Sequence, residues 1–164
     1  MVAGQAAGMS KARQVEVTER PLRGDERYDY ADAFEIRAAA PSPLSAEGFA
    51  RLALEASPRP IRWGLYTLLR HVIRLRLAPR SSADHVLGWP VTVSEHDVVQ
   101  LEAESALIRG IIVGRRVDET LARVTTFVVY KRPLAARAMW TVASPLHRLV
   151  ARRLMERAAA QQSG

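Results

Sequence analysis

The chain has 164 residues and no cysteine, so disulfide bonds, thiolate metal sites and cysteine nucleophiles are excluded. Its length suits one domain with a hydrophobic core of its own, and its hydrophobic (48%) and charged (25%) fractions are those of an ordinary globular protein. The net charge of +7 is almost entirely arginine, because Lys11 and Lys131 are the only lysines. Such Arg-rich, Lys-poor sequences are typical of GC-rich bacterial genomes. This favours a solvated basic surface over a site for nucleic acid or anionic lipid.

The N-terminus has the composition of a tail rather than of a targeting segment. Residues 1–12 are rich in small and polar residues, which predicts disorder, and residues 13–160 are expected to form a single domain. The basic start and apolar run of a signal peptide are absent, and so are the roughly 18 uninterrupted apolar residues of a membrane-spanning helix. We therefore expect a cytoplasmic protein.

The first half of the chain predicts one clear strand and two helices. Residues 28–38 alternate as a half-buried strand does, and Asp32 shares one face of that strand with apolar and aromatic residues. Ser45 is suited to cap the first helix, and the Ser-Pro-Arg-Pro run at residues 57–60 ends it. A second, amphipathic helix is expected over residues 61–77.

The second half predicts an antiparallel sheet closed by a long helix. Four segments, separated by gaps of turn length, favour a meander over a parallel sheet. Residues 133–160 then carry apolar side chains at helical spacing, with a break at Ser144-Pro145. The predicted class is α+β, with a curved antiparallel sheet wrapped around the C-terminal helix and two shorter helices after the first strand. The four expected strands are residues 89–94, 98–105, 107–115 and 120–131.

The order of these elements resembles the START-like helix-grip fold (the SRPBCC superfamily), which includes lipid-transfer and polyketide-cyclase-type proteins. A narrower similarity over residues 28–157 is to a bacterial domain-of-unknown-function family that is placed with this superfamily. Leu146 departs from that family's pattern, which has Phe at this position. The resemblance implies a cavity between the C-terminal helix and the concave face of the sheet, able to hold an apolar or amphipathic molecule. The similar segments are residues 30–34 (YADAF), 88–91 (GWPV), 125–130 (TTFVVY) and 140–148 (WTVASPLHR).

Six side chains are candidates for binding a ligand in such a cavity, and the strongest have a structural alternative. Trp140 would floor a pocket or merely pack in the core. His147 would act as a hydrogen-bonding group or general base, or it would be satisfied by backbone or a neighbouring carboxylate and fix how the helix docks. The six candidates are Trp140, His147, Val150, Trp63, Tyr66 and Tyr130.

Other catalytic and metal-binding patterns are missing from the sequence. Without a His-x-x-x-His pair or an HExxH run we expect no metal, and without a nucleophile elbow or phosphate loop we expect no cofactor. Glu102 and Glu104 lie two residues apart and would point the same way from a strand. They would form an acid/base pair only on the concave face, for which Val99, Leu101 and Ala103 compete.

Three functions stay open at this point. The first is binding of a small apolar or amphipathic molecule in the cavity. The second is a structural or interaction module that contacts an anionic membrane or a protein through Arg-rich helices. The third function is that of a cyclase- or hydrolase-type enzyme that uses His147. Nucleic acid is not expected as a partner, because no platform of aromatic residues is evident.

Overall fold

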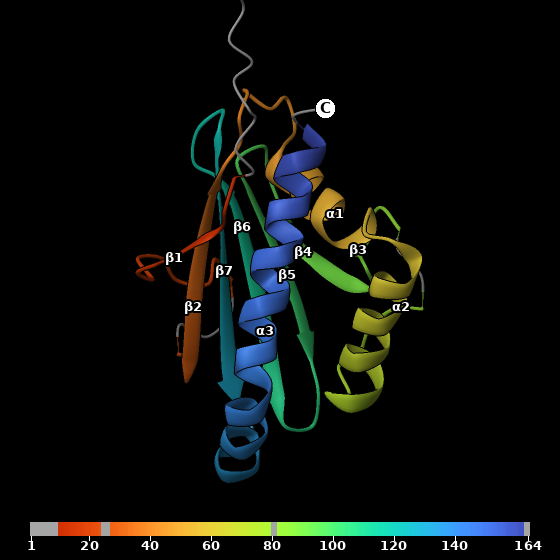
Figure 1. Cartoon of the computed structure of the whole chain (residues 1–164). Coiled ribbons are helices and arrows are strands. Elements are labelled where there is room, and N and C mark those ends of the chain that lie inside the picture. The colour runs from red at the N-terminus through yellow and green to blue at the C-terminus, as the bar shows by residue number, and fades with distance from the viewer. Residues whose placement is uncertain (1–9, 24–26, 80–81, 163–164) are drawn as a thin grey trace, which may run out of the picture.

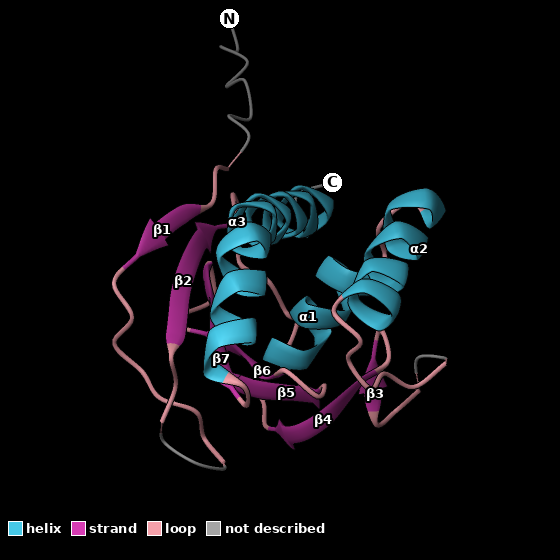
Figure 2. Cartoon of the chain, turned by 90° about the horizontal axis from the view of Figure 1, so that it is seen from below, coloured by secondary structure: helices cyan, strands magenta, loops and turns pink. Residues whose placement is uncertain are grey.

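A seven-stranded antiparallel sheet forms a curved layer, and all the helices lie on its concave side (Figure 2). The computed structural model describes residues 10–23, 27–79 and 82–162. The strand order is β1-β2-β7-β6-β5-β4-β3, so the last strand of the chain pairs with the long N-terminal strand β2. The strands are β1 (Arg13–Val15), β2 (Tyr30–Arg37), β3 (His85–Val86), β4 (Trp89–Ser94), β5 (Val98–Glu104), β6 (Ile108–Arg116) and β7 (Leu121–Tyr130).

The described residues also form three α-helices: α1 (Ala46–Glu55), α2 (Arg59–Thr67) and α3 (Pro133–Gln162). Helix α3 runs the length of the sheet across its concave side, with α1 and α2 beside it (Figure 1). Ser45 caps α1 as expected, since its hydroxyl accepts a hydrogen bond from the Gly48 N–H at 3.1 Å. The α+β class, the curved antiparallel sheet and the long closing helix are therefore confirmed.

The predicted break in the C-terminal helix is wrong, because α3 continues through Pro145. Proline inside a helix lacks the N–H that would bond the carbonyl four residues earlier, here that of Thr141. Both Thr141 and Pro145 are exposed, so water can hydrogen-bond the freed carbonyl. The hydrogen bond that Pro145 removes is thus lost on the outer side of the helix, while residues on the inner side stay buried before and after it.

The second helix is shorter than predicted. It passes from α2 into a π-helical segment, η1 (Leu68–Val72), and Arg74 has a φ of 60°, which ends the helix. Leu75 and Leu77 are both buried, and the Arg76 N–H donates to the Glu104 carbonyl at 2.8 Å. Two buried leucines spaced by two residues have the period of extended chain, which the helical assignment overlooked.

The N-terminal segment covers the convex face of the sheet. Val17 packs with a cluster that includes Ile111 and Phe127, and the Leu22 N–H donates to Oε1 of buried Gln100 at 2.7 Å. Residues 1–9 of the expected tail lie outside the described residues. Ala12, in contrast, is buried beside α3, and its N–H donates to the Glu156 carboxylate at 3.1 Å. None of the described helices is long and apolar enough to cross a membrane.

Candidate functional site

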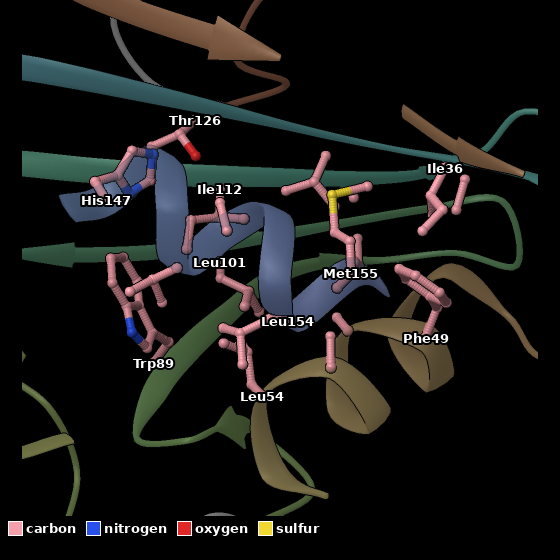
Figure 3. Close-up of a pocket in the computed structure, with 18 of the residues that line it drawn as sticks. Ile36, Phe49, Leu54, Trp89, Leu101, Ile112, Thr126, His147, Leu154 and Met155 are labelled. Atoms are coloured by element: carbon pink, nitrogen blue, oxygen red, sulfur yellow. The ribbon is translucent and has the colours of Figure 1, made fainter. Parts of the chain in front are cut away.

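A cavity of about 590 Å³ lies between the concave face of the sheet and the helices. This volume falls in the range of ~300–1,000 Å³ that is usual for small-molecule sites. Figure 3 shows His147 and Thr126 at one end of the cavity and Ile36, Phe49 and Met155 at the other. Aliphatic side chains from four strands and all the helices dominate the wall between these ends, including Leu54, Leu65, Leu69, Leu101, Ile112, Val124, Val128, Val150 and Leu154.

Small residues on the facing layers account for the space. Ala50 and Ala53 of α1 and Ala143 and Ala151 of α3 line the cavity, where larger side chains would fill it. Gly110 of β6 lets the indole of Trp89 lie against the sheet, since a Cβ at this glycine would come within 3.2 Å of the ring. Protein interiors are otherwise close-packed, so a void of this size requires wall residues too small to close it.

The cavity opens between η1 and α3. Val72 of η1 lines the cavity although its exposed fraction is 68%, and across the gap Val142 and Leu146 line it with exposed fractions of 81% and 48%. Side chains that border both the interior space and the solvent mark a mouth. An apolar molecule therefore has a route from the surface to the interior wall.

One end of the cavity carries a buried hydrogen-bonding group. The Asp32 side chain is 2% exposed, and both of its carboxylate oxygens lie 3.3 Å from Nε2 of His147. One of them, Oδ2, also accepts a hydrogen bond from the Tyr30 hydroxyl at 2.6 Å. Because a carboxylate can only accept, the His147 nitrogen that faces it must carry the proton. In neutral His147 the other ring nitrogen, Nδ1, is then a hydrogen-bond acceptor.

Burial raises the pKa of Tyr30 well above its ordinary value, and the hydrogen bond to Asp32 and the charge of that carboxylate raise the pKa further. The phenol is thus protonated at neutral pH and donates a hydrogen bond to Asp32. Asp32 therefore accepts one hydrogen bond from a neutral phenol, and its carboxylate also contacts His147.

Strand pairing and helix spacing bring these groups together. Asp32 of β2 pairs directly with Thr126 of β7, which lines the cavity. Trp140 lies two turns before His147 on α3, and their ring centroids are 5.3 Å apart. The Trp140 ring is also 5.3 Å from Tyr30, in an edge-to-face arrangement. A carboxylate, a phenol, an imidazole and an indole therefore converge from β2 and α3.

The structure places the six candidate residues in two groups. Trp140, His147 and Val150 line the cavity. Trp63, Tyr66 and Tyr130 are not among the residues that line it. Aromatic character alone does not specify that a side chain faces the cavity.

Each of these three aromatic residues has another position in the fold. Trp63 is 71% exposed, because Leu65 of α2 and Leu69 of η1 face the cavity instead. The Tyr66 hydroxyl donates to the Ala78 carbonyl at 2.9 Å, which ties α2 to the loop before β3. Tyr130 is half-buried at the end of β7.

The contact between Asp32 and His147 is the feature of the candidate site that the sequence did not predict. The available signal was a lone carboxylate on the apolar face of the β2 strand. Glu102 and Glu104 do not reach the cavity: Glu102 pairs with Arg109 and Glu104 with Lys131, each at 2.6 Å. Within the described ranges, no three His, Cys, Asp or Glu side chains are placed to hold a metal ion.

Comparisons of the chain with protein-family profiles, with curated proteins and with solved structures gave no match. The START-like resemblance thus rests on element order and short motifs. The candidate site has to be interpreted from its own geometry.

Proposed function

We propose that this protein binds one small apolar or amphipathic molecule in the cavity between α3 and the concave face of the sheet. The observation that carries the proposal is the cavity itself, which has a volume of about 590 Å³ and an almost wholly apolar wall. Removing apolar surface from water stabilises a complex by about 25 cal/mol for each Å² buried. An apolar ligand fits this wall because it forfeits no hydrogen bonds there.

The polar end of the cavity defines how an amphipathic ligand would lie. Its polar group would meet His147 and Thr126, and its apolar part would extend toward Phe49 and Met155. The side chains of Ile36 and Phe49 offer a polar group no hydrogen bond in place of those it has with water. The proposed orientation therefore rests on His147 and Thr126 at one end of the cavity and on Ile36 and Phe49 at the other.

A neutral fluorescent probe, N-phenyl-1-naphthylamine, tests the proposal without confusing charge attraction with burial. The wild type should bind one probe per chain, with rising fluorescence, and native mass spectrometry after incubation with a lipid extract should show one retained molecule. Ala143→Phe fills the cavity and should lose both signals. Ala138→Phe makes the same change on the exposed side of α3 and should keep them. Equal binding by the two variants would contradict a site in the cavity.

A second candidate is acid/base catalysis, which the Asp32–His147 contact favours. A carboxylate-oriented imidazole in an apolar cavity can take a proton from a water molecule that attacks an ester carbonyl, releasing an acid and an alcohol. p-Nitrophenyl esters of short and medium chain length are suitable probes. Asp32→Asn should then abolish release of p-nitrophenol, while the variant should still bind N-phenyl-1-naphthylamine. Release that is unchanged in this variant, or absent in the wild type, would dismiss the catalytic role.

A further inference from the structure

Exposed apolar side chains surround the mouth of the cavity. On α3, Val142, Leu146 and Leu149 follow one another at spacings of four and three, which places them on one face of the helix. Leu149 is 53% exposed and does not line the cavity. Across the mouth, Val72 of η1 is also exposed. Single exposed apolar residues are ordinary, but here Val72, Val142 and Leu146 border one opening and Leu149 continues the same face of α3.

Arginines continue the exposed α3 face beyond this apolar rim, and the segments that form the rim carry no acids. Residues 56–83 and residues 121–155 contain no Asp or Glu. Arg153 and Arg157 extend the exposed α3 face at spacings of four. Arg153 and Arg157 form no ion pair with any residue in the described part of the chain, whereas many other arginines, such as Arg109 and Arg123, do.

We propose that the mouth of the cavity docks on an anionic lipid bilayer, with Val142, Leu146 and Leu149 inserted among the head groups and Arg153 and Arg157 on the phosphates. The inference rests on the proposed function: docking on a bilayer would let an apolar ligand reach the cavity without crossing water. A bilayer offers an apolar layer and negative charge side by side, which is the pattern of this rim. A polyanion such as RNA would match the arginines alone.

Co-sedimentation with vesicles tests the docking face. The full chain should bind vesicles of phosphatidylcholine with phosphatidylglycerol, bind neutral phosphatidylcholine vesicles weakly, and lose affinity at high salt. Arg153→Glu should lower the partition coefficient about fivefold or more, since each cation near an anionic surface contributes on the order of 1 kcal/mol. Leu149→Ser should also lower it. The matched controls Arg23→Glu and Leu22→Ser lie on the segment that covers the convex face and should bind as the wild type does.

Docking and ligand binding can fail separately in this design. The Leu149→Ser variant should still bind N-phenyl-1-naphthylamine. The Ala143→Phe variant should still bind vesicles but should no longer bind the probe. If vesicle binding ignores lipid charge, or if the rim variants and their controls behave alike, the docking proposal is overturned and the cavity proposal stands. If Arg153→Glu weakens binding and Leu149→Ser does not, the face is a general polyanion site and the bilayer proposal is also overturned. If vesicles bind as predicted but no variant or wild type takes the probe, the docking surface exists without the cavity function.

Discussion

The convex face of the sheet is covered by a single extended segment, whereas the concave face is covered by helices (Figure 2). On the convex side Ile111, Val113 and Phe127 have no exposed surface, and the Tyr28 ring lies 5.1 Å from that of Phe127. On the concave side much longer elements leave a cavity of about 590 Å³. The chain thus buries the centre of this face with few residues. The cavity lies on the concave side, where the alanines and Gly110 that line it are too small to fill it.

The polar groups of the two faces differ in the same way. On the convex side Glu19 contacts Arg115 and Thr125, and Glu35 accepts from Arg123 at 2.8 Å, so each carboxylate is held by a cation or hydroxyl in a filled interface. On the concave side Asp32 is held by a phenol and an imidazole, and the imidazole borders open space. The first arrangement binds two parts of the chain together. The second leaves one hydrogen-bonding group available to a ligand.

The comparison is tested most strongly by two neighbouring isoleucines on β6. Ile111 points into the filled convex core, and Ile112 lines the cavity. Ile→Ala typically costs about 2–5 kcal/mol, and the cost rises with the size of the void that is created. Ile111→Ala should therefore lie near the top of this range and Ile112→Ala near the bottom. Urea unfolding of both variants measures the difference, and equal losses would mean that the concave face is as tightly packed as the convex one.

Removing the carboxylate at the polar end should have the next largest effect. Asp32→Ala leaves the Tyr30 hydroxyl and the His147 N–H without their acceptor, and we expect a loss of about 1.5–3 kcal/mol in the free energy of unfolding. Glu104→Ala removes an exposed carboxylate that pairs with Lys131 and should cost no more than about 1 kcal/mol. Denaturant unfolding at neutral pH compares the two. Similar losses would show that the Asp32 group is solvated and not part of the concave interior.

Trp140→Phe should cost little for a change to a buried aromatic residue, about 1 kcal/mol or less. The Trp140 indole N–H is buried without a hydrogen-bond partner among the described residues, so its removal relieves an unsatisfied donor while most of the ring contacts with Tyr30 and His147 remain. Thermal and urea unfolding supply the measurement. A loss of several kcal/mol in the free energy of unfolding would mean that this indole makes a specific hydrogen bond and that the concave wall is packed more tightly than the structure shows.

The smallest effect concerns the pH dependence of stability. Because the pKa of Tyr30 is raised by burial and by Asp32, the native state keeps the phenol neutral at a pH where the unfolded chain ionises it. The stabilisation is fully present below about pH 10 and declines progressively above it, since unfolding then releases a proton. Tyr30→Phe should flatten that decline. Unfolding curves from pH 9 upward, with absorbance of ionised phenol at 295 nm, check the sign; an unchanged slope in the variant would assign the decline to other groups.

Sequence periodicity predicted the elements of the fold well, because each signal is local. Alternation marked β2 and β5, Ser45 marked the start of α1, and helical spacing marked α3. The errors arose where a local rule met tertiary context. Pro145 is tolerated because it lies on the outer side of α3, and Leu75 and Leu77 are buried on extended chain where helical spacing predicts a helix.

The candidate site was only partly predictable. His147 and Trp140 were recognised because seven residues along a helix return to the same face, and both line the cavity. The contact between His147 and Asp32 joins residues 115 positions apart, and no local pattern specifies it. It follows from the pairing of β2 with β7 and from how far along the sheet α3 lies.

By itself the sequence determined which faces are apolar, where strands and helices form, and that the last helix is basic on its outer side, because these properties depend on neighbouring residues. Only the tertiary structure decided that the concave face stays hollow, that Asp32 meets His147, and that the cavity opens beside exposed valines and leucines. The physical reason is that a void depends on the balance of volumes between facing layers. That balance is a sum over segments distant in the chain, and no single segment contains it.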